Sequence, residues 1–134
     1  MQWFADTWFF AALLDRSDGH HQHARRIQAR ISRTSDIVTH EAVLTELLAH
    51  FSDDGAVPRA SAAAAVRHYL RNGQVIVVDR ELFLLGLDLY ASRPDKEWSH
   101  VDCMSMVVME QRGIRHVLTN DHHFAQAGFT IVNQ

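Results

Sequence analysis

The fold class is decided by the stretch SHVDCMSMVVMEQRGIRHVLTND, which runs from Ser99 to Asp121. Its first part, Ser99–Arg112, has apolar residues at helical spacing, and Gly113 is the kind of residue that ends a helix. Arg115–Leu118 then reads as a short strand. A helix that leads directly into an apolar strand is the unit from which parallel α/β sheets are built.

The same alternation extends over the rest of the 134-residue chain. Further strands are predicted at Gln2–Ala5, Ile37–Thr39, Gln74–Val78 and Phe129–Val132. Further helices are predicted at Thr7–Leu14, Gln22–Ser32, Glu41–Phe51, Pro58–Leu70, Glu81–Ser92 and His122–Ala127. This pattern implies a three-layer α/β/α sandwich with a small, mainly parallel central sheet. We expect one domain over residues 1–134, because the chain is too short for two ordinary cores.

Composition narrows the class of protein. No apolar run is long enough to cross a membrane, and residues 1–6 lack the basic start of a signal peptide. The single cysteine, Cys103, lies in an apolar helical stretch, so we expect a buried reduced thiol in a cytoplasmic protein. The net charge is −3, yet 12 of the 13 basic residues are arginine. The arginines at positions 25, 26, 30 and 33 are interpreted first as a solvated helix face, with phosphate binding as the alternative.

Four acidic residues stand out by their positions. Asp6 directly follows the first predicted strand, and Asp121 follows the strand Arg115–Leu118 by two residues. Asp102 lies in the first turn of the helix before that strand, and Glu46 lies within an apolar helical run. In open parallel sheets, ligands bind in the crevice outside the carboxyl ends of the strands. The acids therefore mark a candidate site at that end of the sheet.

Each aspartate also has a purely structural interpretation. Asp6 and Asp121 suit the N-cap position of the helix that follows each, and Ser99 with Asp102 fits a capping box. Taken together, several acids directed at one region repel one another unless a cation neutralises them. Glu41 competes with Glu46 for a place in the site. The two lie about 140° apart around a helix, so we interpret Glu41 as structural.

Carboxylates are the ligands that Mg²⁺ prefers, and Mn²⁺ accepts them too. A bound ion can polarise a scissile phosphate and lower the pKa of an attacking water, so no protein nucleophile is required. The sequence has neither a Gly-rich phosphate loop nor a serine nucleophile elbow. Its ten histidines form no pattern typical of a closed zinc site, and we assign them to packing, hydrogen bonding or contacts at the rim of the site.

Four motifs together resemble the PIN domain family, and especially its VapC-type ribonuclease toxins. The resemblance spans essentially the whole chain, and its C-terminal motifs are the most specific. A departure is His100-Val101, where relatives often carry smaller or more apolar residues, which affects the expected pocket rim. The matching segments are Asp6-Thr7 with DGHHQHA (18–24), THEAVLTELL (39–48), WSHVDCMSMVVM (98–109) and TNDHHFAQAGF (119–129).

The resemblance implies a function and a set of partners. It implies that four acids bind Mg²⁺ or Mn²⁺ and activate water for RNA cleavage, with Asp6 and Asp102 as direct ligands. Glu46 and Asp121 would ligate directly or through water, and the Thr119 hydroxyl would orient Asp121 or a metal-bound water. It also implies a homodimer and a small antitoxin protein as partner. Two alternatives stay open: a non-catalytic PIN-like module that binds RNA or protein, and a metal-dependent phosphodiesterase acting on DNA.

Overall fold

A computed structural model describes residues 1–132 of the protein. Its centre is a five-stranded sheet in the order β3-β2-β1-β4-β5, and every neighbouring pair of strands is parallel. The strands are short, as the sequence predicted for a small sheet covered by helices. Their bounds are Trp3–Ala5 (β1), Ile37–His40 (β2), Gln74–Ile76 (β3), His116–Leu118 (β4) and Thr130–Ile131 (β5).

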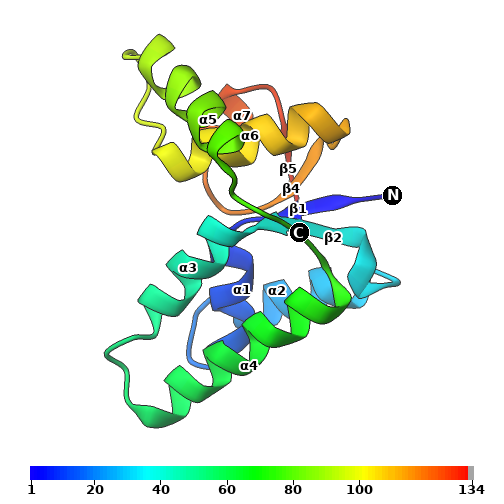
Figure 1. The fold of residues 1–134 in the computed structure, drawn as a ribbon. Coiled ribbons are helices and arrows are strands. Elements are labelled where there is room, and N and C mark those ends of the chain that lie inside the picture. The colour runs from blue at the N-terminus through cyan, green and yellow to red at the C-terminus, as the bar shows by residue number, and fades with distance from the viewer. Residues whose placement is uncertain (133–134) are drawn as a thin grey trace.

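Helices cover the sheet in two groups, and Figure 1 shows α1–α4 on one side and α5–α7 on the other. Right-handed crossovers explain this division. The chain steps from β1 to β2 to β3 in one direction, then returns past β1 to β4 and β5, so the later helices lie on the opposite face. The helices are Thr7–Leu14 (α1), His21–Ala29 (α2), Glu41–His50 (α3), Ala56–Asn72 (α4), Arg80–Ser92 (α5), His100–Arg112 (α6) and His123–Gln126 (α7).

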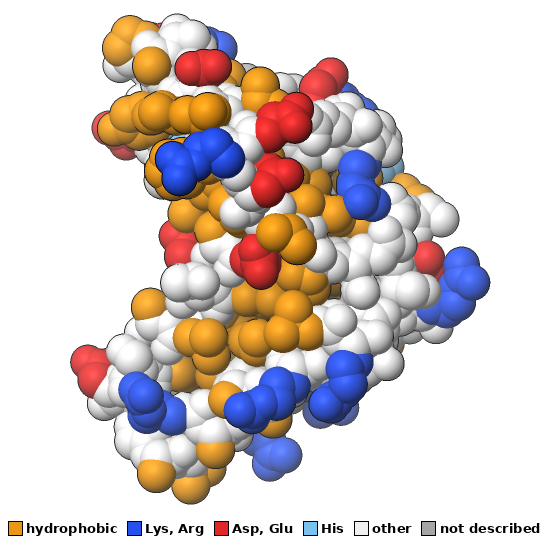
Figure 2. Space-filling model, in the orientation of Figure 1, with side chains coloured by type: hydrophobic (Ala, Val, Ile, Leu, Met, Phe, Trp, Pro, Cys, Tyr) orange, Lys and Arg blue, Asp and Glu red, His pale blue; other side chains and the backbone are white. Residues whose placement is uncertain are grey.

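The reversal of direction between β1 and β4 creates the crevice in which α/β proteins bind ligands. Ala5 pairs with Leu118 at the ends of these strands, and the backbone N–H of Asp6 donates to the Leu118 carbonyl at 3.2 Å. The residues that follow each strand therefore leave the sheet side by side. Figure 2 shows, in the same orientation, a hollowed outline at the left between the two helix groups, and acidic side chains down the middle of the view.

The core holds the crevice in place. Phe4, Val38 and Val117, one from each of the three central strands, are completely buried. On the α5–α7 side, Gly86 lets α5 approach α6 closely, because a Cβ atom there would lie 2.5 Å from the Cγ of Met104. The apolar stripe of α6 is core, and, as the sequence predicted, the single thiol is buried and free.

Several predicted bounds need correction. The strand predicted at Gln74–Val78 ends at Ile76, because its pairing with β2 ends there, opposite His40. The helix predicted to open at Pro58 begins at Ala56, since proline is tolerated in a first turn. The helix predicted at Gln22–Ser32 spans His21–Ala29 and is followed by a short 3₁₀ helix at Thr34–Asp36. Among residues 1–132, no helix combines the length and apolar character needed to cross a membrane.

Candidate metal centre

Asp6 is the most enclosed of the four predicted acids. It follows β1 at the crevice, its side chain makes no capping bond to α1, and it is only 8% exposed. The Thr119 hydroxyl, at the end of β4, donates to Asp6 Oδ2 at 2.9 Å. The pKa of Asp6 is raised from 3.8 to about 6, mainly by burial and to a smaller extent by the negative charges of Asp102 and Glu46, against the hydrogen bonds from Thr7 and Thr119. Asp6 is therefore a desolvated carboxylate among other acids.

Glu46 reaches the same region from α3. The Thr7 hydroxyl at the start of α1 donates to Glu46 Oε1 at 2.8 Å, which ties this side chain to the residue next to Asp6. Glu46 itself is exposed, so its place in an apolar run reflects an open helix face and does not by itself require a function. Glu41 points elsewhere and accepts a hydrogen bond from Val78 N at 2.8 Å, in line with the structural interpretation.

Asp102 lies in the first turn of α6. The capping box predicted from the sequence is present, because Ser99 Oγ accepts from Asp102 N at 3.0 Å and Asp102 Oδ2 accepts from Ser99 N at 3.1 Å. Asp102 Oδ2 also lies 3.2 Å from His123 Nδ1. Its charge acts on Asp6, so the structural role of Asp102 and its nearness to the other acids coexist.

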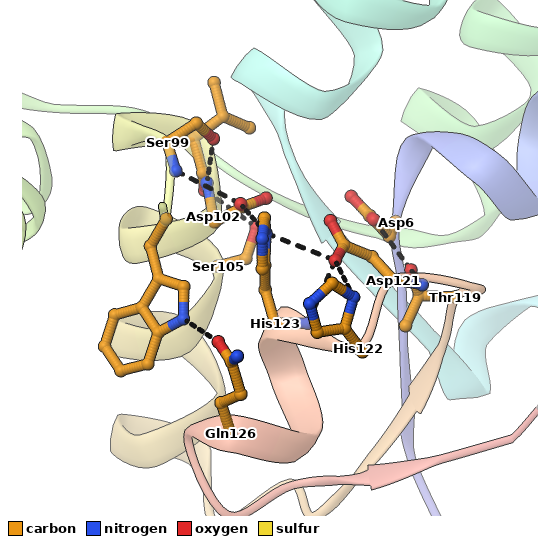
Figure 3. Close-up of polar contacts among 11 residues, drawn as sticks. Asp6, Ser99, Asp102, Ser105, Thr119, Asp121, His122, His123 and Gln126 are labelled. Carbon is orange, nitrogen blue, oxygen red and sulfur yellow. Dashed lines mark hydrogen bonds and ion pairs between the residues drawn. The ribbon is translucent and has the colours of Figure 1, made fainter. Parts of the chain in front are cut away.

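Asp121 follows β4 and folds back on the start of α7. Its backbone N–H donates to the Thr119 hydroxyl at 3.1 Å, and its Oδ1 accepts from His123 N at 2.9 Å. The helix predicted at His122–Ala127 spans His123–Gln126, so its N-cap residue is His122 and not Asp121. Asp121 Oδ1 also lies 3.2 Å from His123 Nδ1. Figure 3 shows the His123 ring between Asp102 and Asp121, with Thr119 and Asp6 beyond them.

The sequence interpretation assigned His123, like the other histidines, to packing, hydrogen bonding or the rim of the site, and not to the group of acids. His123 lies two residues after Asp121, which is the only signal for it in the sequence. Because α7 has four residues, no periodicity indicates which way this side chain points. The ligand atoms of Asp121, His122 and His123 all lie within 4.8 Å of one another. The candidate site thus combines carboxylates with an imidazole.

The chemistry of these donors fits a divalent cation. Asp6 and its acidic neighbours supply carboxylate oxygens, the ligands of Mg²⁺ and Mn²⁺. Burial, the main cause of the raised pKa of Asp6, and the negative charges nearby leave the ionised form of this carboxyl poorly stabilised. A bound cation would remove that deficit and favour the ionised carboxylate. The arrangement is thus suited to binding a hard divalent ion at the crevice between β1 and β4.

Comparisons with known proteins give the family. The PIN domain model matches residues 4–130. The 23S rRNA-specific endonuclease VapC20 of Mycobacterium tuberculosis is 32% identical over 129 residues, which cover 96% of each chain. The crystal structure of VapC20, described as a sarcin-ricin loop cleaving toxin, aligns with a TM-score of 0.87 and 29% identity over 98% of each chain.

A more distant structure supports the fold alone. FitAcB from Neisseria gonorrhoeae aligns over 97% of this chain and 96% of that one, with a TM-score of 0.67 and 14% identity. The five parallel strands and their two groups of helices are therefore a shared architecture. From the match over nearly its whole length, and from a fold shared with VapC20, the chain belongs to the PIN domain family.

Proposed function

We propose that this protein is a metal-dependent endoribonuclease and the toxin of a type II toxin–antitoxin pair. The observation that carries the proposal is the buried Asp6 carboxylate at the crevice between β1 and β4, with a raised pKa and with Asp102 and Glu46 as acidic neighbours. A bound cation would stabilise such a site, because it offsets the repulsion among the carboxylates. The similarity to VapC20, an rRNA endonuclease by name, supplies the reaction class.

Each side chain has a distinct proposed role. Asp6 and Asp102 hold Mg²⁺ or Mn²⁺ directly, and Glu46 and Asp121 hold it directly or through water. When bound, the ion supplies positive charge that polarises the scissile phosphate and lowers the pKa of an attacking water. The protein contributes a fixed geometry, because hydroxyl groups of the chain restrain two of the ligands. Thr119 restrains Asp6, and Thr7 restrains Glu46.

RNA is the proposed substrate class. Ribosomal RNA is the first RNA to test, because the similar protein VapC20 is named as a 23S rRNA-specific endonuclease. The acids of the crevice repel phosphate unless a cation is bound. Substrate binding is therefore expected to depend on the metal. The exposed arginines of α2, Arg25 and Arg26, offer positive charge on the α1–α4 side of the molecule.

The proposed partners are a small antitoxin protein and a second copy of the chain. A homodimer is supported by the apolar face of α5, where Phe83, Leu84, Leu87 and Tyr90 are 41–51% exposed. Figure 2 shows hydrophobic side chains over this helix. Water contact at such a face is unfavourable, and association removes it. Analytical ultracentrifugation tests the dimer. The cytoplasm is the proposed location, in keeping with the free thiol.

Cleavage assays on purified protein test the function. With Mg²⁺ or Mn²⁺, the wild type should cut ribosomal RNA, and EDTA or the substitution Asp102→Asn should stop it. Asp53→Asn, which changes an exposed acid in the loop after α3, is the matched control and should cleave normally. If wild type and Asp102→Asn are equally inert and both bind RNA, the non-catalytic module is correct. If DNA is cut in preference to RNA, the phosphodiesterase alternative is correct.

A further inference from the structure

One imidazole lies among the acids of the candidate centre. His123 Nδ1 lies 3.2 Å from Asp102 Oδ2 and 3.2 Å from Asp121 Oδ1 (Figure 3). The three side chains are sheltered, with exposed fractions of 18% for His123, 13% for Asp102 and 33% for Asp121. A single nitrogen therefore faces one oxygen from α6 and one from the loop after β4.

The backbone fixes this arrangement. His123 is the first residue of α7, and its N–H donates to the same Asp121 oxygen, at 2.9 Å, that its ring faces. Asp102 is fixed in turn by its capping box with Ser99. Phe124, the next residue, is completely buried and anchors α7 in the core. The ring of His123 is thus held in place by its neighbours along the chain.

The distances match those between ligands of one metal ion. Metal–ligand bonds of about 2.1 Å at angles between octahedral and tetrahedral values place adjacent ligand atoms about 3.0–3.4 Å apart. Both 3.2 Å separations from His123 Nδ1 fall in that range. His122 lies farther out, with its Nδ1 3.9 Å from Asp121 Oδ1 and a side chain that is 77% exposed. The geometry favours His123 as a ligand over His122.

We propose that His123 Nδ1 is a metal ligand, together with Asp102 and Asp121, and makes the centre prefer Mn²⁺ to Mg²⁺. Mg²⁺ takes oxygen ligands almost exclusively, whereas imidazole nitrogen binds transition-metal ions well. This inference deepens the proposed function, since it concerns the same centre. The contrasting explanation is an imidazolium that hydrogen-bonds both carboxylates and holds no metal.

Pulsed electron paramagnetic resonance distinguishes the two explanations without using activity. Protein stripped of metal is loaded with half an equivalent of Mn²⁺, and the electron spin-echo modulation from directly coordinated ¹⁴N is recorded. The wild type should show that modulation, and protein labelled with ¹⁵N-histidine should show the ¹⁵N pattern in its place. Because labelling leaves the fold unchanged, this comparison does not depend on any variant folding.

Variants then identify the histidine. His123→Gln should abolish the nitrogen modulation and weaken Mn²⁺ binding by at least about 10-fold, with a smaller loss for Mg²⁺ in competition titrations. His122→Gln should keep the modulation. His116→Gln, at the other end of β4, is the matched control and should equal the wild type. Circular dichroism of each metal-free variant checks that it folds.

The possible failures separate clearly. If Mn²⁺ binds the wild type, Asp102→Asn weakens that binding, and no nitrogen modulation appears, then His123 is not a ligand while the metal-dependent function stands. A modulation that persists in His123→Gln also overturns the inference. If wild type and Asp102→Asn bind Mn²⁺ equally weakly, the proposed metal dependence itself fails.

Discussion

Two aspartates at equivalent junctions of the sheet behave differently. Asp6 lies between β1 and α1, and Asp79 occupies the position before α5, after β3. Asp79 caps its helix, because its Oδ1 accepts a hydrogen bond from Leu82 N at 2.8 Å. Asp6 makes no side-chain cap to α1 and accepts from the hydroxyl of Thr119, which directly follows β4. The same residue type thus serves its own helix at one junction and the crevice at the other.

The difference follows from where each strand lies. β3 is an edge strand, and Asp79 is exposed, so its carboxylate keeps water and one local bond. β1 is central, beside β4, and Asp6 is buried there with a pKa raised to about 6 by that burial. The hydrogen bonds from Thr7 and Thr119 do not offset the desolvation of Asp6, so its ionised form is poorly stabilised by the chain alone. This contrast separates the carboxylate that we propose as a metal ligand from a structural one.

Neutralising each aspartate is the strongest test of the comparison. Asp6→Asn should lower RNA cleavage by about 1,000-fold, or ~4 kcal/mol in the activation free energy, because a metal ligand is lost. Asp79→Asn should leave cleavage unchanged, since asparagine also caps helices. In EDTA at pH 7, Asp6→Asn should be at least as stable as the wild type, because a buried charge is removed. Equal losses of activity in the two variants would contradict the distinction.

The residue before α3 extends the comparison of strand–helix junctions, because it predicts how the stability of the protein depends on pH. His40 precedes that helix, is fully buried and makes no side-chain cap; its Nε2 lies 2.9 Å from Ser105 Oγ. The Ser105 hydroxyl donates to Val101 O at 3.0 Å, so it accepts from His40, which is neutral with its proton on Nε2. Burial lowers the pKa of His40 from 6.5 to about 4.

Because folding lowers the pKa of His40, the unfolded state binds a proton at a higher pH than the folded state does. The contribution of His40 to stability is therefore complete above the pKa of the unfolded state. That stabilisation is lost as the pH falls from about 6.5 towards 4, by up to about 3 kcal/mol in the free energy of unfolding. His40→Gln should therefore depend less on pH over this range. Urea denaturation of both proteins at pH 7 and 4.5 measures it, and Asp6 titrates equally in both. Parallel pH profiles would show that His40 does not carry the effect.

Much of the fold follows from the sequence because local signals agree with tertiary ones. α1 has the predicted bounds, and Gly113 ends α6 with a φ of 67°, which glycine adopts freely. β3 is shorter than predicted because β-branched residues mark strands without saying where pairing stops. Residues beyond Ile76 have the composition of a strand and no partner strand to extend the ladder.

The candidate site is predictable in part. The positions of Asp6 and Asp121 relative to two strands place them at one edge of a parallel sheet, and the structure brings them to the same crevice. Glu46 was predicted as a site residue because it lies in an apolar run of the sequence. Its side chain, however, lies on an exposed helix face. His123 was not selected, since its contact with Asp102 depends on how α7 packs against α6, which no local pattern encodes.

The Thr119 hydroxyl is what gives Asp6 a partner outside its own helix. It is completely buried, donates to Asp6 Oδ2 at 2.9 Å and accepts from Asp121 N at 3.1 Å. Thr119→Val keeps the shape and removes both bonds, so cleavage should fall by about 10-fold, with weaker metal binding by calorimetry. Thr130→Val, at an exposed position of β5, is the control. Unchanged cleavage in Thr119→Val would show that Asp6 needs no positioning.

The smallest effect is expected at the structural aspartate. Asp79→Ala removes the bond to Leu82 N and should lower the free energy of unfolding by about 1 kcal/mol, measured by urea denaturation. Asp79→Asn should recover most of that loss, and both variants should cleave RNA like the wild type. The two aspartates then differ in the property that they support. Neutralising Asp6 lowers activity without loss of stability, whereas truncating Asp79 lowers stability without loss of activity. A fall in cleavage by Asp79→Ala larger than its stability loss explains would place Asp79 in the crevice's function as well.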